Sequence, residues 1–462
     1  YDENIWLASN GGGIGGYWGD VRSDGTSTSH GSKSTGSIPF MRVVDSQMLA
    51  FNQGTTRRGS YACYMDISHP EIEEFLFMRK SSGGDANRKC LNLHHGINIT
   101  DDFMTAVNKN IDWKLIDPHS KKVAKSINAR ELWRLILETR HETGEPYLHF
   151  VDTSNRSLPE TQKKLGLSIK QSNLCSEITL PTDEDRTAVC CLSSVNLAKY
   201  DEWSTSPTFI PDMVRMLDNV LEHFIQATYD FSYDYKGDVL EMKVKEGMEG
   251  FTKAGYSAYR ERSLGLGAMG FHTYLQKLNV PFEGPIATGQ NLKMFRQIKE
   301  LANKTSMELA EERGEAPDME GTGMRNAHLL AIAPNATSSI ICGGTSPSIE
   351  PIRANVFIHK TLNGSFQVRN RQLHNLLKQK WNNSEELQKE YDSDYQQFKD
   401  KIWQSISENT GSVKHLDFLT DLEKDVFKTA DEIDQNWIIE HASKRQEFIC
   451  QAQSVNLFFV AP

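Results

Sequence analysis

Strand-like segments alternate with helix-like segments between residues 60 and 355, and this alternation constrains the fold of the chain most. Ser60–Ile67, Leu91–Thr100 and Tyr147–Val151 have the composition and spacing of strands, and residues 129–142 repeat apolar side chains at helical spacing. Chains that alternate in this way form α/β proteins, whose parallel strands are buried between helices. We therefore expect an α/β architecture.

No repeat of fixed period and no break in composition divides the 462 residues, so we expect one domain over residues 1–462, mainly helical in residues 355–462. The net charge of −10 argues against a nucleic-acid partner. No apolar run approaches the roughly 18 residues of a membrane span, and no signal-like segment opens the chain. Seven cysteines, an odd and sparse number, suit a reducing compartment, so we expect a cytoplasmic protein with no membrane partner.

The stretch Gln171–Thr182 carries the most concentrated candidate chemistry. Asn173, Cys175 and Glu177 stand at every second position, and in an extended segment this spacing places an amide, a thiol and a carboxylate on one face. A thiol beside a hydrogen-bonding amide and a candidate general base is a compact catalytic set. Three such residues also meet by chance, so the triple needs support from the rest of the chain. A second cysteine site, Cys190, follows downstream.

Two glycine-containing segments have weaker functional interpretations. Residues 10–37 are rich in Gly, Ser and Thr and are expected to form loops, and residues 11–16 fit Gly-x-Gly-x-x-Gly. A dinucleotide site is disfavoured there, because the preceding segment is too polar for a buried strand and no clear helix follows. Residues 52–59 predict a polar loop whose Arg57 and Arg58 suit phosphates or base edges, with a solvated turn as the alternative.

Two further segments are candidate ligand-binding sites. His94 and His95 are adjacent in a predicted strand, so they face opposite ways, and we expect no metal site there. His328–Pro334 reads as a buried strand, and Asn335–Ile341 as the turn that follows it. Hydroxyl residues that cap a helix after a strand form a ready anion site, because backbone N–H groups converge there, although Thr-Ser-Ser is also a common N-cap.

Several motifs occur in one order at compatible spacing along most of the chain. They are Gly12–Gly15, Gln53–Gly59, Ser172–Ile178, Cys190–Asn196, Arg262–Gly267, Pro334–Ser339 and Ser348–Pro351. Taken together, they resemble the large, catalytic subunit of class I ribonucleotide reductase, most closely the enterobacterial and T-even-phage type. An ordered set is far more specific than any single motif, so the triple in Gln171–Thr182 is expected to be a site.

The resemblance implies a ten-stranded α/β barrel of two five-stranded parallel halves, with Cys175 at the tip of a central finger loop. It implies reduction of ribonucleoside diphosphates to their 2′-deoxy forms. Cys175 would become a thiyl radical and remove the ribose 3′ hydrogen, so its thiol should stay neutral, with a pKa near or above the usual value of about 8.5. Glu177 would be the base at the 3′-OH, Asn173 the partner of the ribose hydroxyls, and Cys190 one of two redox cysteines.

The resemblance also assigns substrate and effector contacts. The residues it gives to the substrate phosphates are Asn335, Ala336, Thr337 and Ser338, and Gly13 would approach the substrate. Gln53 and Arg57 would belong to the loop that relays effector identity to the substrate base. The preceding Ser/Thr-rich segment falls where the family binds dNTP or ATP effectors at a dimer interface.

The resemblance implies partners rather than a cofactor or metal held by this chain. A small subunit with a radical-generating metal, a thioredoxin- or glutaredoxin-type reductant and nucleoside triphosphate effectors would be required. The large subunit would be a homodimer or would join a missing part of itself, in the host cytoplasm if a phage encodes it.

Several elements of the family pattern are not found. The second redox cysteine should precede Gly13, and the radical-transfer tyrosines and the C-terminal cysteine pair should follow Pro462. We therefore expect a fragment, or one part of a split enzyme, that has no multiple-turnover activity alone. The remaining thiols match none of these roles: Cys63, Cys90, Cys191, Cys342 and Cys450.

Two alternatives remain open. The first is a class II reductase, which forms the same thiyl radical from adenosylcobalamin, and adding that cofactor in place of a small subunit would separate the two. The second is a remnant that binds nucleotides or pairs with a partner without catalysis. Replacement of Cys175 by alanine in a reconstituted complex would leave such a remnant unaffected.

Overall fold

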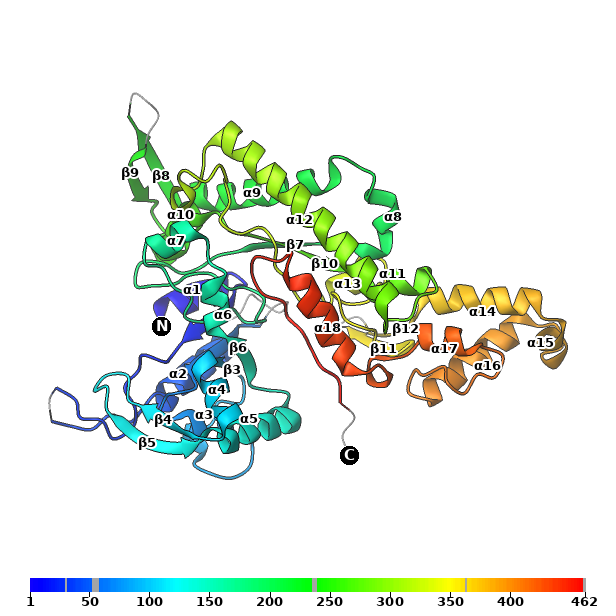
Figure 1. Cartoon of the computed structure of the whole chain (residues 1–462), viewed down its shortest axis with the longest axis horizontal. Coiled ribbons are helices and arrows are strands. Elements are labelled where there is room, and N and C mark those ends of the chain that lie inside the picture. The colour runs from blue at the N-terminus through cyan, green and yellow to red at the C-terminus, as the bar shows by residue number, and fades with distance from the viewer. Residues whose placement is uncertain (30, 52–57, 235–238, 362–363, 460–462) are drawn as a thin grey trace. The chain divides into compact units, whose positions relative to one another are not determined.

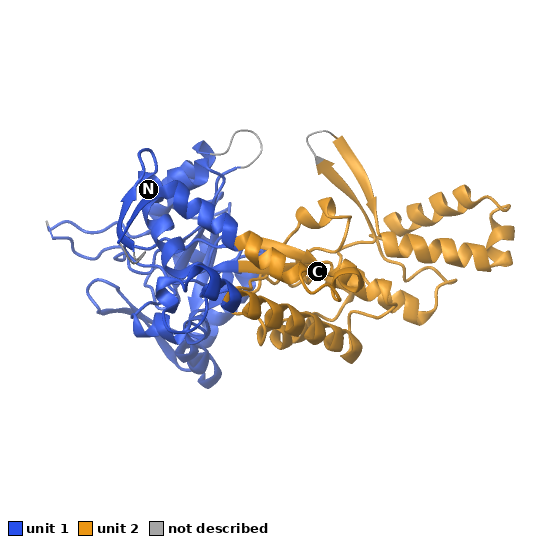
Figure 2. Ribbon diagram, turned by 90° about the horizontal axis from the view of Figure 1, so that it is seen from above, with its two compact units in different colours: residues 1–191, 218–264, 307–328 blue, residues 192–217, 265–306, 329–462 orange. Residues whose placement is uncertain are grey.

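The computed structural model describes residues 1–29, 31–51, 58–234, 239–361 and 364–459 (Figure 1). Contacts within the chain group it into two compact units (Figure 2). Unit 1 consists of residues 1–191, 218–264 and 307–328, and unit 2 of residues 192–217, 265–306 and 329–462. Across the described ranges, no helix combines the length and apolar character that crossing a membrane requires.

Unit 1 is built on a parallel sheet of four strands in the order β1, β2, β3, β6. These strands span Gly13–Tyr17, Ser60–Asp66, His94–Ile99 and Tyr147–Phe150. Parallel neighbours need crossover connections, and helices lie in each of them. The helices are α2 (Ile38–Ala50), α3 (Ile72–Phe77), α4 (Asp101–Lys109) and α5 (Ala129–Thr143). The strands predicted near residues 60, 91 and 147 and the helix predicted at 129–142 are confirmed.

The two faces of this sheet differ in chemistry. Side chains of Ile14, Cys63, Met65 and Ile97 pack with the crossover helices in one apolar core. Because side chains alternate along a strand, the residues between them face the other way. That opposite side, here called the loop face, carries Gly13, Gly15 and Tyr17 from β1, Tyr64 and Asp66 from β2, Gly96 and Asn98 from β3, and Tyr147 and His149 from β6.

One expectation for unit 1 was wrong. The segment 10–37 contains β1, because its glycines fit a strand against which another segment packs closely. Helix α9 spans Phe209–Thr228, and Tyr229–Tyr233 after it forms β8, which pairs with β9 (Val239–Val244). Aromatic side chains at alternate positions of β8 favour the strand.

Most residues of β7 (Cys191–Asn196) and β10 (Leu264–Met269), which pair with each other, belong to unit 2. The predicted strand at 328–334 is buried and extended but pairs only at isolated positions, Leu330 with Leu266 and Ile332 with Gln453. The remaining elements of this unit are mainly helical: α8 (Tyr200–Trp203), α11 (Phe271–Lys277), the first part of α12 (Pro285–Arg313), α13 (Ser338–Ile341), the hairpin of β11 (Val356–Thr361) and β12 (Gly364–Arg369), α14 (Arg371–Asn383), α15 (Glu385–Glu390), α16 (Tyr395–Glu408), α17 (Asp421–Val426) and α18 (Gln435–Gln446).

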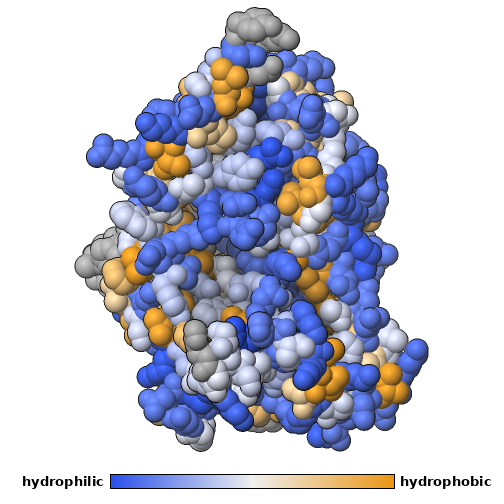
Figure 3. Space-filling view, turned by 90° about the vertical axis from the view of Figure 1, so that its left-hand side faces the viewer, coloured by the Kyte–Doolittle hydropathy of each residue, from blue (hydrophilic) through white to orange (hydrophobic). Residues whose placement is uncertain are grey.

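The remaining secondary structure of unit 1 is peripheral to the parallel sheet. It comprises α1 (Asp2–Ser9), the antiparallel pair of β4 (Asp112–Ile116) and β5 (Val123–Asn128), α6 (Val151–Arg156), α7 (Glu160–Lys164) and α10 (Thr252–Glu261). The surface in Figure 3 is mostly hydrophilic, with hydrophobic side chains in small separate groups, as is usual for a surface in contact with water.

Candidate active site

The cysteine loop, residues 172–178, makes a tight turn and is not a strand. Leu174 and Cys175 form the turn, and Ser176 has a left-handed backbone with φ of 63°. The turn is closed by two hydrogen bonds: Ser172 Oγ donates to the Ile178 carbonyl at 2.7 Å, and the Ile178 N–H donates to Asn173 Oδ1 at 3.2 Å. The prediction that Asn173, Cys175 and Glu177 share one face of a strand was therefore wrong.

Glycines of β1 let this loop lie directly against the sheet. A Cβ atom on Gly13 would stand 2.8 Å from the Leu174 side chain, and one on Gly15 would stand 2.3 Å from the Ser172 carbonyl oxygen. Real Cβ atoms do not approach backbone oxygen so closely, so Gly15 cannot carry a side chain without moving the loop. The Tyr64 hydroxyl adds a hydrogen bond to the Asn173 carbonyl at 2.7 Å.

Glu177, the charged residue of this loop, is buried, with 2% of its surface exposed. Burial raises the pKa of Glu177, and its own backbone N–H and a hydrogen bond from the Asn173 side chain oppose that rise. Its Oε2 atom has no hydrogen-bond partner within the described part of the chain. The carboxylate is thus oriented by Asn173 and keeps one oxygen ready to accept a proton.

Cys175 is half-buried, and two tyrosines of the loop face are close enough to interact with it electrostatically. Burial raises the pKa of Tyr64 and of Tyr147, and the nearby Cys175 and Glu177 add to both rises. Both phenols therefore stay protonated at neutral pH. Neither tyrosine was predicted to belong to the site, because they are distant from the loop in sequence and only strand alternation could have indicated them.

Cys190 and Cys191 also belong to unit 1, and both are half-buried. The Sγ atom of Cys190 lies 3.9 Å from the carbonyl oxygen of Cys191. Burial raises the pKa of Cys191 to about 11, with a smaller contribution from the negative charge of Asp218. Cys191 is therefore a protonated thiol at neutral pH.

In contrast to the cysteine loop, the 335–338 loop of unit 2, whose last residue begins α13, is largely exposed. Asn335 has φ of 50°, and its side-chain amide donates to Ser194 Oγ at 2.8 Å and to the Ala333 carbonyl at 3.0 Å. Its amide therefore holds the loop in place. The three residues that follow are exposed: Ala336, Thr337 and Ser338. The predicted hydroxyl cap is absent, because Thr337 makes no side-chain hydrogen bond to α13, which is only four residues long.

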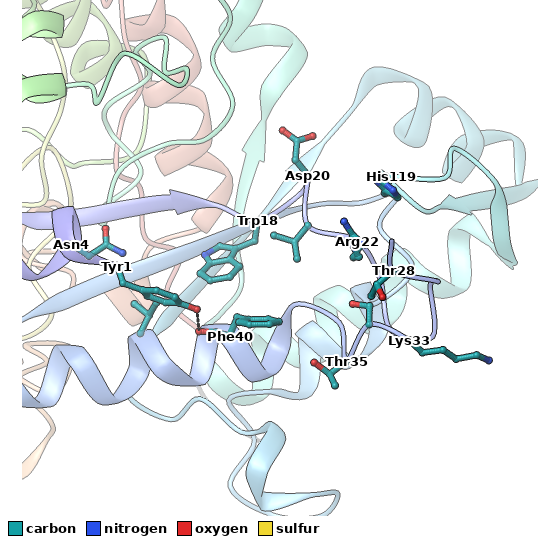
Figure 4. A pocket seen from close by; sticks show the side chains of 13 residues that line it. Tyr1, Asn4, Trp18, Asp20, Arg22, Thr28, Lys33, Thr35, Phe40 and His119 are labelled. Carbon is teal, nitrogen blue, oxygen red and sulfur yellow. Dashed lines mark hydrogen bonds between the residues drawn. The ribbon is translucent and has the colours of Figure 1, made fainter. Parts of the chain in front are cut away.

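A cavity of about 740 Å³ lies in unit 1 beside the Ser/Thr-rich segment. Figure 4 shows aromatic side chains at one end of it, Tyr1, Trp18 and Phe40, and the polar Arg22, Thr28 and His119 at the other. Gln53 and Arg57, which the sequence predicts as effector-relay residues, lie outside the described residues.

The sequence model of the family described as "Ribonucleotide reductase, barrel domain" matches residues 1–322 and 317–462. A putative ribonucleoside-diphosphate reductase large subunit of Frog virus 3 is 48% identical over 99% of this chain and 74% of that protein. The large subunit of Invertebrate iridescent virus 3 is 44% identical over 92% of this chain and 71% of that protein.

A solved structure of the same family is also similar to this chain. The class Id ribonucleotide reductase alpha subunit of Actinobacillus ureae is 33% identical, with a TM-score of 0.79, over 98% of this chain and 74% of that chain. The predicted likeness to the enterobacterial and T-even-phage type stays a prediction. With a family match along its whole length and viral relatives nearly half identical to it, the chain belongs to the ribonucleotide reductase large-subunit family and carries its barrel domain.

Proposed function

We propose that this chain reduces ribonucleoside diphosphates to 2′-deoxyribonucleoside diphosphates, with the thiyl radical on Cys175. The observation that carries the proposal is the fixed turn that contains both a half-buried thiol, Cys175, and, two residues on, the buried carboxylate of Glu177. A radical must be kept from solvent, and a base at the ribose needs an orientation set before substrate arrives. Both requirements fit a loop clamped to a sheet.

The candidate site residues take separate roles in the proposed reduction. Cys175 takes the 3′ hydrogen and returns it at the end, while Glu177 accepts the 3′-OH proton and Asn173 binds the ribose hydroxyls. Cys190 protonates the leaving 2′-OH, which departs as water. Cys190 and a second thiol, not assigned to a residue, supply two electrons as they form a disulfide.

The exposed backbone and hydroxyls of the 335–338 loop are proposed to bind the substrate phosphates, with Asn335 holding the loop in place. These residues carry no charged side chain, so their hydroxyl and backbone N–H groups would bind the diphosphate through hydrogen bonds. Gly13 is proposed to lie near the substrate. We further propose that residues 1–462 act as one catalytic domain with the ten-stranded barrel of the family.

The cavity of Figure 4 is our proposed effector site. Its aromatic end suits a nucleobase, and Arg22, Lys33 and His119 suit a triphosphate. Phe40, which lines the cavity, and Val43 of the same helix α2 are each 46% exposed, which supports a homodimer that covers this helix. Gln53 and Arg57 are proposed to relay the effector signal, and a metal-containing small subunit and a thioredoxin- or glutaredoxin-type reductant to complete the enzyme in the cytoplasm.

The test is product formation by the chain, expressed with the flanking sequence of its gene and combined with a small subunit, an effector and a dithiol reductant. We expect Cys175→Ala to remove deoxyribonucleoside diphosphate formation and Cys191→Ala to retain it. Equal activity of both variants would overturn the proposal. Activity that appears only when adenosylcobalamin replaces the small subunit would instead identify a class II enzyme.

A further inference from the structure

Polar side chains cross the loop face of the sheet near the carboxyl ends of its strands. Asp66, Asn98 and His149 stand directly opposite one another in the parallel register of β2, β3 and β6. Asn98 is 1% exposed and His149 is 6% exposed. Burying such groups is costly unless hydrogen bonds replace those made with water, so their partners show what they are for.

Asn98 connects the sheet to the start of the cysteine loop. Its Nδ2 atom donates to Asp66 Oδ1 and to the backbone carbonyl of Lys170, both at 2.8 Å. Its Oδ1 atom lies 2.8 Å from Nδ1 of His149. The amide thus uses both of its N–H groups and its oxygen, and one of these bonds fixes the backbone two residues before the loop begins.

His149 sets the orientation of that amide. Because Asn98 Oδ1 only accepts, His149 must carry its hydrogen on Nδ1, which leaves Nε2 to accept from Ser154 Oγ at 2.9 Å. Burial lowers the pKa of His149 to about 4, so the ring is neutral near pH 7 and keeps this tautomer. The hydrogen bonds therefore run in one direction, from Ser154 through His149 to Asn98.

Other side chains hold the stem of the cysteine loop, residues 169–171, and the loop itself in simpler ways. Asn155 of α6 pairs with Ile169 through two bonds, Nδ2 to the carbonyl at 2.9 Å and Oδ1 from the N–H at 2.8 Å. The Tyr64 hydroxyl holds the Asn173 carbonyl. Asn98 differs in that a buried imidazole orients it, so two residues must be in place for one bond to the stem.

We propose that Asn98, oriented by His149, is a positioning residue that fixes the stem of the cysteine loop and thereby the place of the Cys175 thiol. Its catalytic meaning rests on the proposed function, whereas its effect on the loop does not. Neither residue touches the reacting atoms in this proposal. They act through the backbone of Lys170.

Hydrogen exchange of the substrate-free chain, followed by mass spectrometry, tests the proposal. We expect Asn98→Leu to speed exchange in residues 170–176 by about tenfold, because the Lys170 carbonyl loses its side-chain donor. His149→Leu should also speed exchange in residues 170–176, by a similar or somewhat smaller factor. His149→Asn should stay near wild type, because its amide nitrogen can take the place of Nδ1 and donate to Asn98. Asn108→Leu, on an exposed position of α4, is the matched control.

Exchange in β2 and β3 reports whether each variant is folded. Unchanged exchange at 170–176 in a folded Asn98→Leu variant would overturn the proposal, and so would equal loosening in His149→Asn and His149→Leu. If Asn98→Leu unfolds the sheet, the difference in loop exchange between His149→Leu and His149→Asn still tests the proposal. A second readout is the rate of Cys175 alkylation, expected to rise severalfold with the loop exchange.

The outcome is separable from that of the proposed function. In the reconstituted reaction, Asn98→Leu should lower kcat by about tenfold or more with little change in KM, because a misplaced thiol affects the chemical step. If the loop loosens as expected but Cys175→Ala still forms product, the positioning role stands and the proposed reaction falls. If the loop does not loosen, the positioning role falls whatever the activity.

Discussion

The cysteine loop of unit 1 and the 335–338 loop of unit 2 are both candidate functional segments, and they are built in opposite ways. The first is closed by its own hydrogen bonds and rests against glycines, with Glu177 buried and Tyr64 holding its backbone. The second is fixed by the Asn335 side chain, which donates to Ser194 Oγ, and its next three residues are exposed. A reacting thiol and its base gain from exclusion of water, whereas donors for a phosphate must be accessible before the ligand arrives.

The difference also predicts how each loop responds to mutation. Changes in the cysteine loop and its support should affect the chemical step and the local structure together. Changes at the exposed positions of the 335–338 loop should affect substrate affinity without affecting the fold, because no packing depends on them.

The largest effect is expected from Glu177→Gln. Removing a positioned general base typically costs about 10²- to 10⁴-fold in rate, so product formation in the reconstituted reaction should fall by that factor. Glu160→Gln, at an exposed position of α7, should leave the rate unchanged. Full activity of Glu177→Gln would show that the buried carboxylate is structural, and the contrast between the loops would lose its chemical basis.

Gly15→Ala should displace the cysteine loop without touching a reactive group. The new Cβ would collide with the Ser172 carbonyl, so the loop must move away from β1. A displacement of about 1 Å costs on the order of a hundredfold in rate. Gly289→Ala of α12 is the matched control, because a Cβ there meets open space. Steady-state rates of both variants, with thermal unfolding as a check of folding, measure the effect.

Ala336→Asp tests the exposed loop with a charge. A carboxylate beside the proposed phosphate site should raise the KM for the diphosphate by about tenfold and leave kcat and the unfolding midpoint unchanged. Ala336→Asn has nearly the same shape without the charge and should stay close to wild type. A large loss of kcat in the aspartate variant would mean that this loop also takes part in the chemical step.

The smallest expected effect is on the pH dependence of stability. The raised pKa of Glu177 means that the folded chain holds this proton more tightly than the unfolded chain does. Its contribution to stability is therefore present at low pH and is lost as the pH rises from the unfolded value of about 4.3 through the raised pKa. Glu177→Gln should be more stable than wild type above that window and lose the advantage below it, as denaturant unfolding at several pH values would show.

Three of the four parallel strands of unit 1, β2, β3 and β6, were predictable. Tyrosines and apolar residues fill β2, Ile97 and Ile99 alternate in β3, β6 is mainly aromatic and apolar, and helices lie between them. The sequence singled out Asn173, Cys175 and Glu177 as a group, and their roles stay predictions, whereas the geometry predicted for them was wrong. The left-handed Ser176 turns the chain back, and nothing in the local pattern demands that conformation.

Long-range contacts explain the other differences. The glycines of β1 read as a loop because the segment that packs on them, at Ser172 to Leu174, lies far along the chain. Asn98 resembles any polar residue near a strand end until Lys170 and His149 are seen beside it. At Thr337 the common N-cap pattern failed, since a helix of four residues offers little for a cap to stabilise.

The two-faced sheet of unit 1 makes the length of its strands as important as their composition. Deleting one residue from β3 would exchange the faces beyond the deletion, turning Asn98 toward the apolar core and Ile97 or Ile99 toward the cysteine loop. One such change would bury an unsatisfied amide and detach the loop stem at once. Insertions and deletions within these strands should therefore be far less tolerated than substitutions, while the same changes in the β8–β9 hairpin would leave the four-stranded sheet and its loop intact.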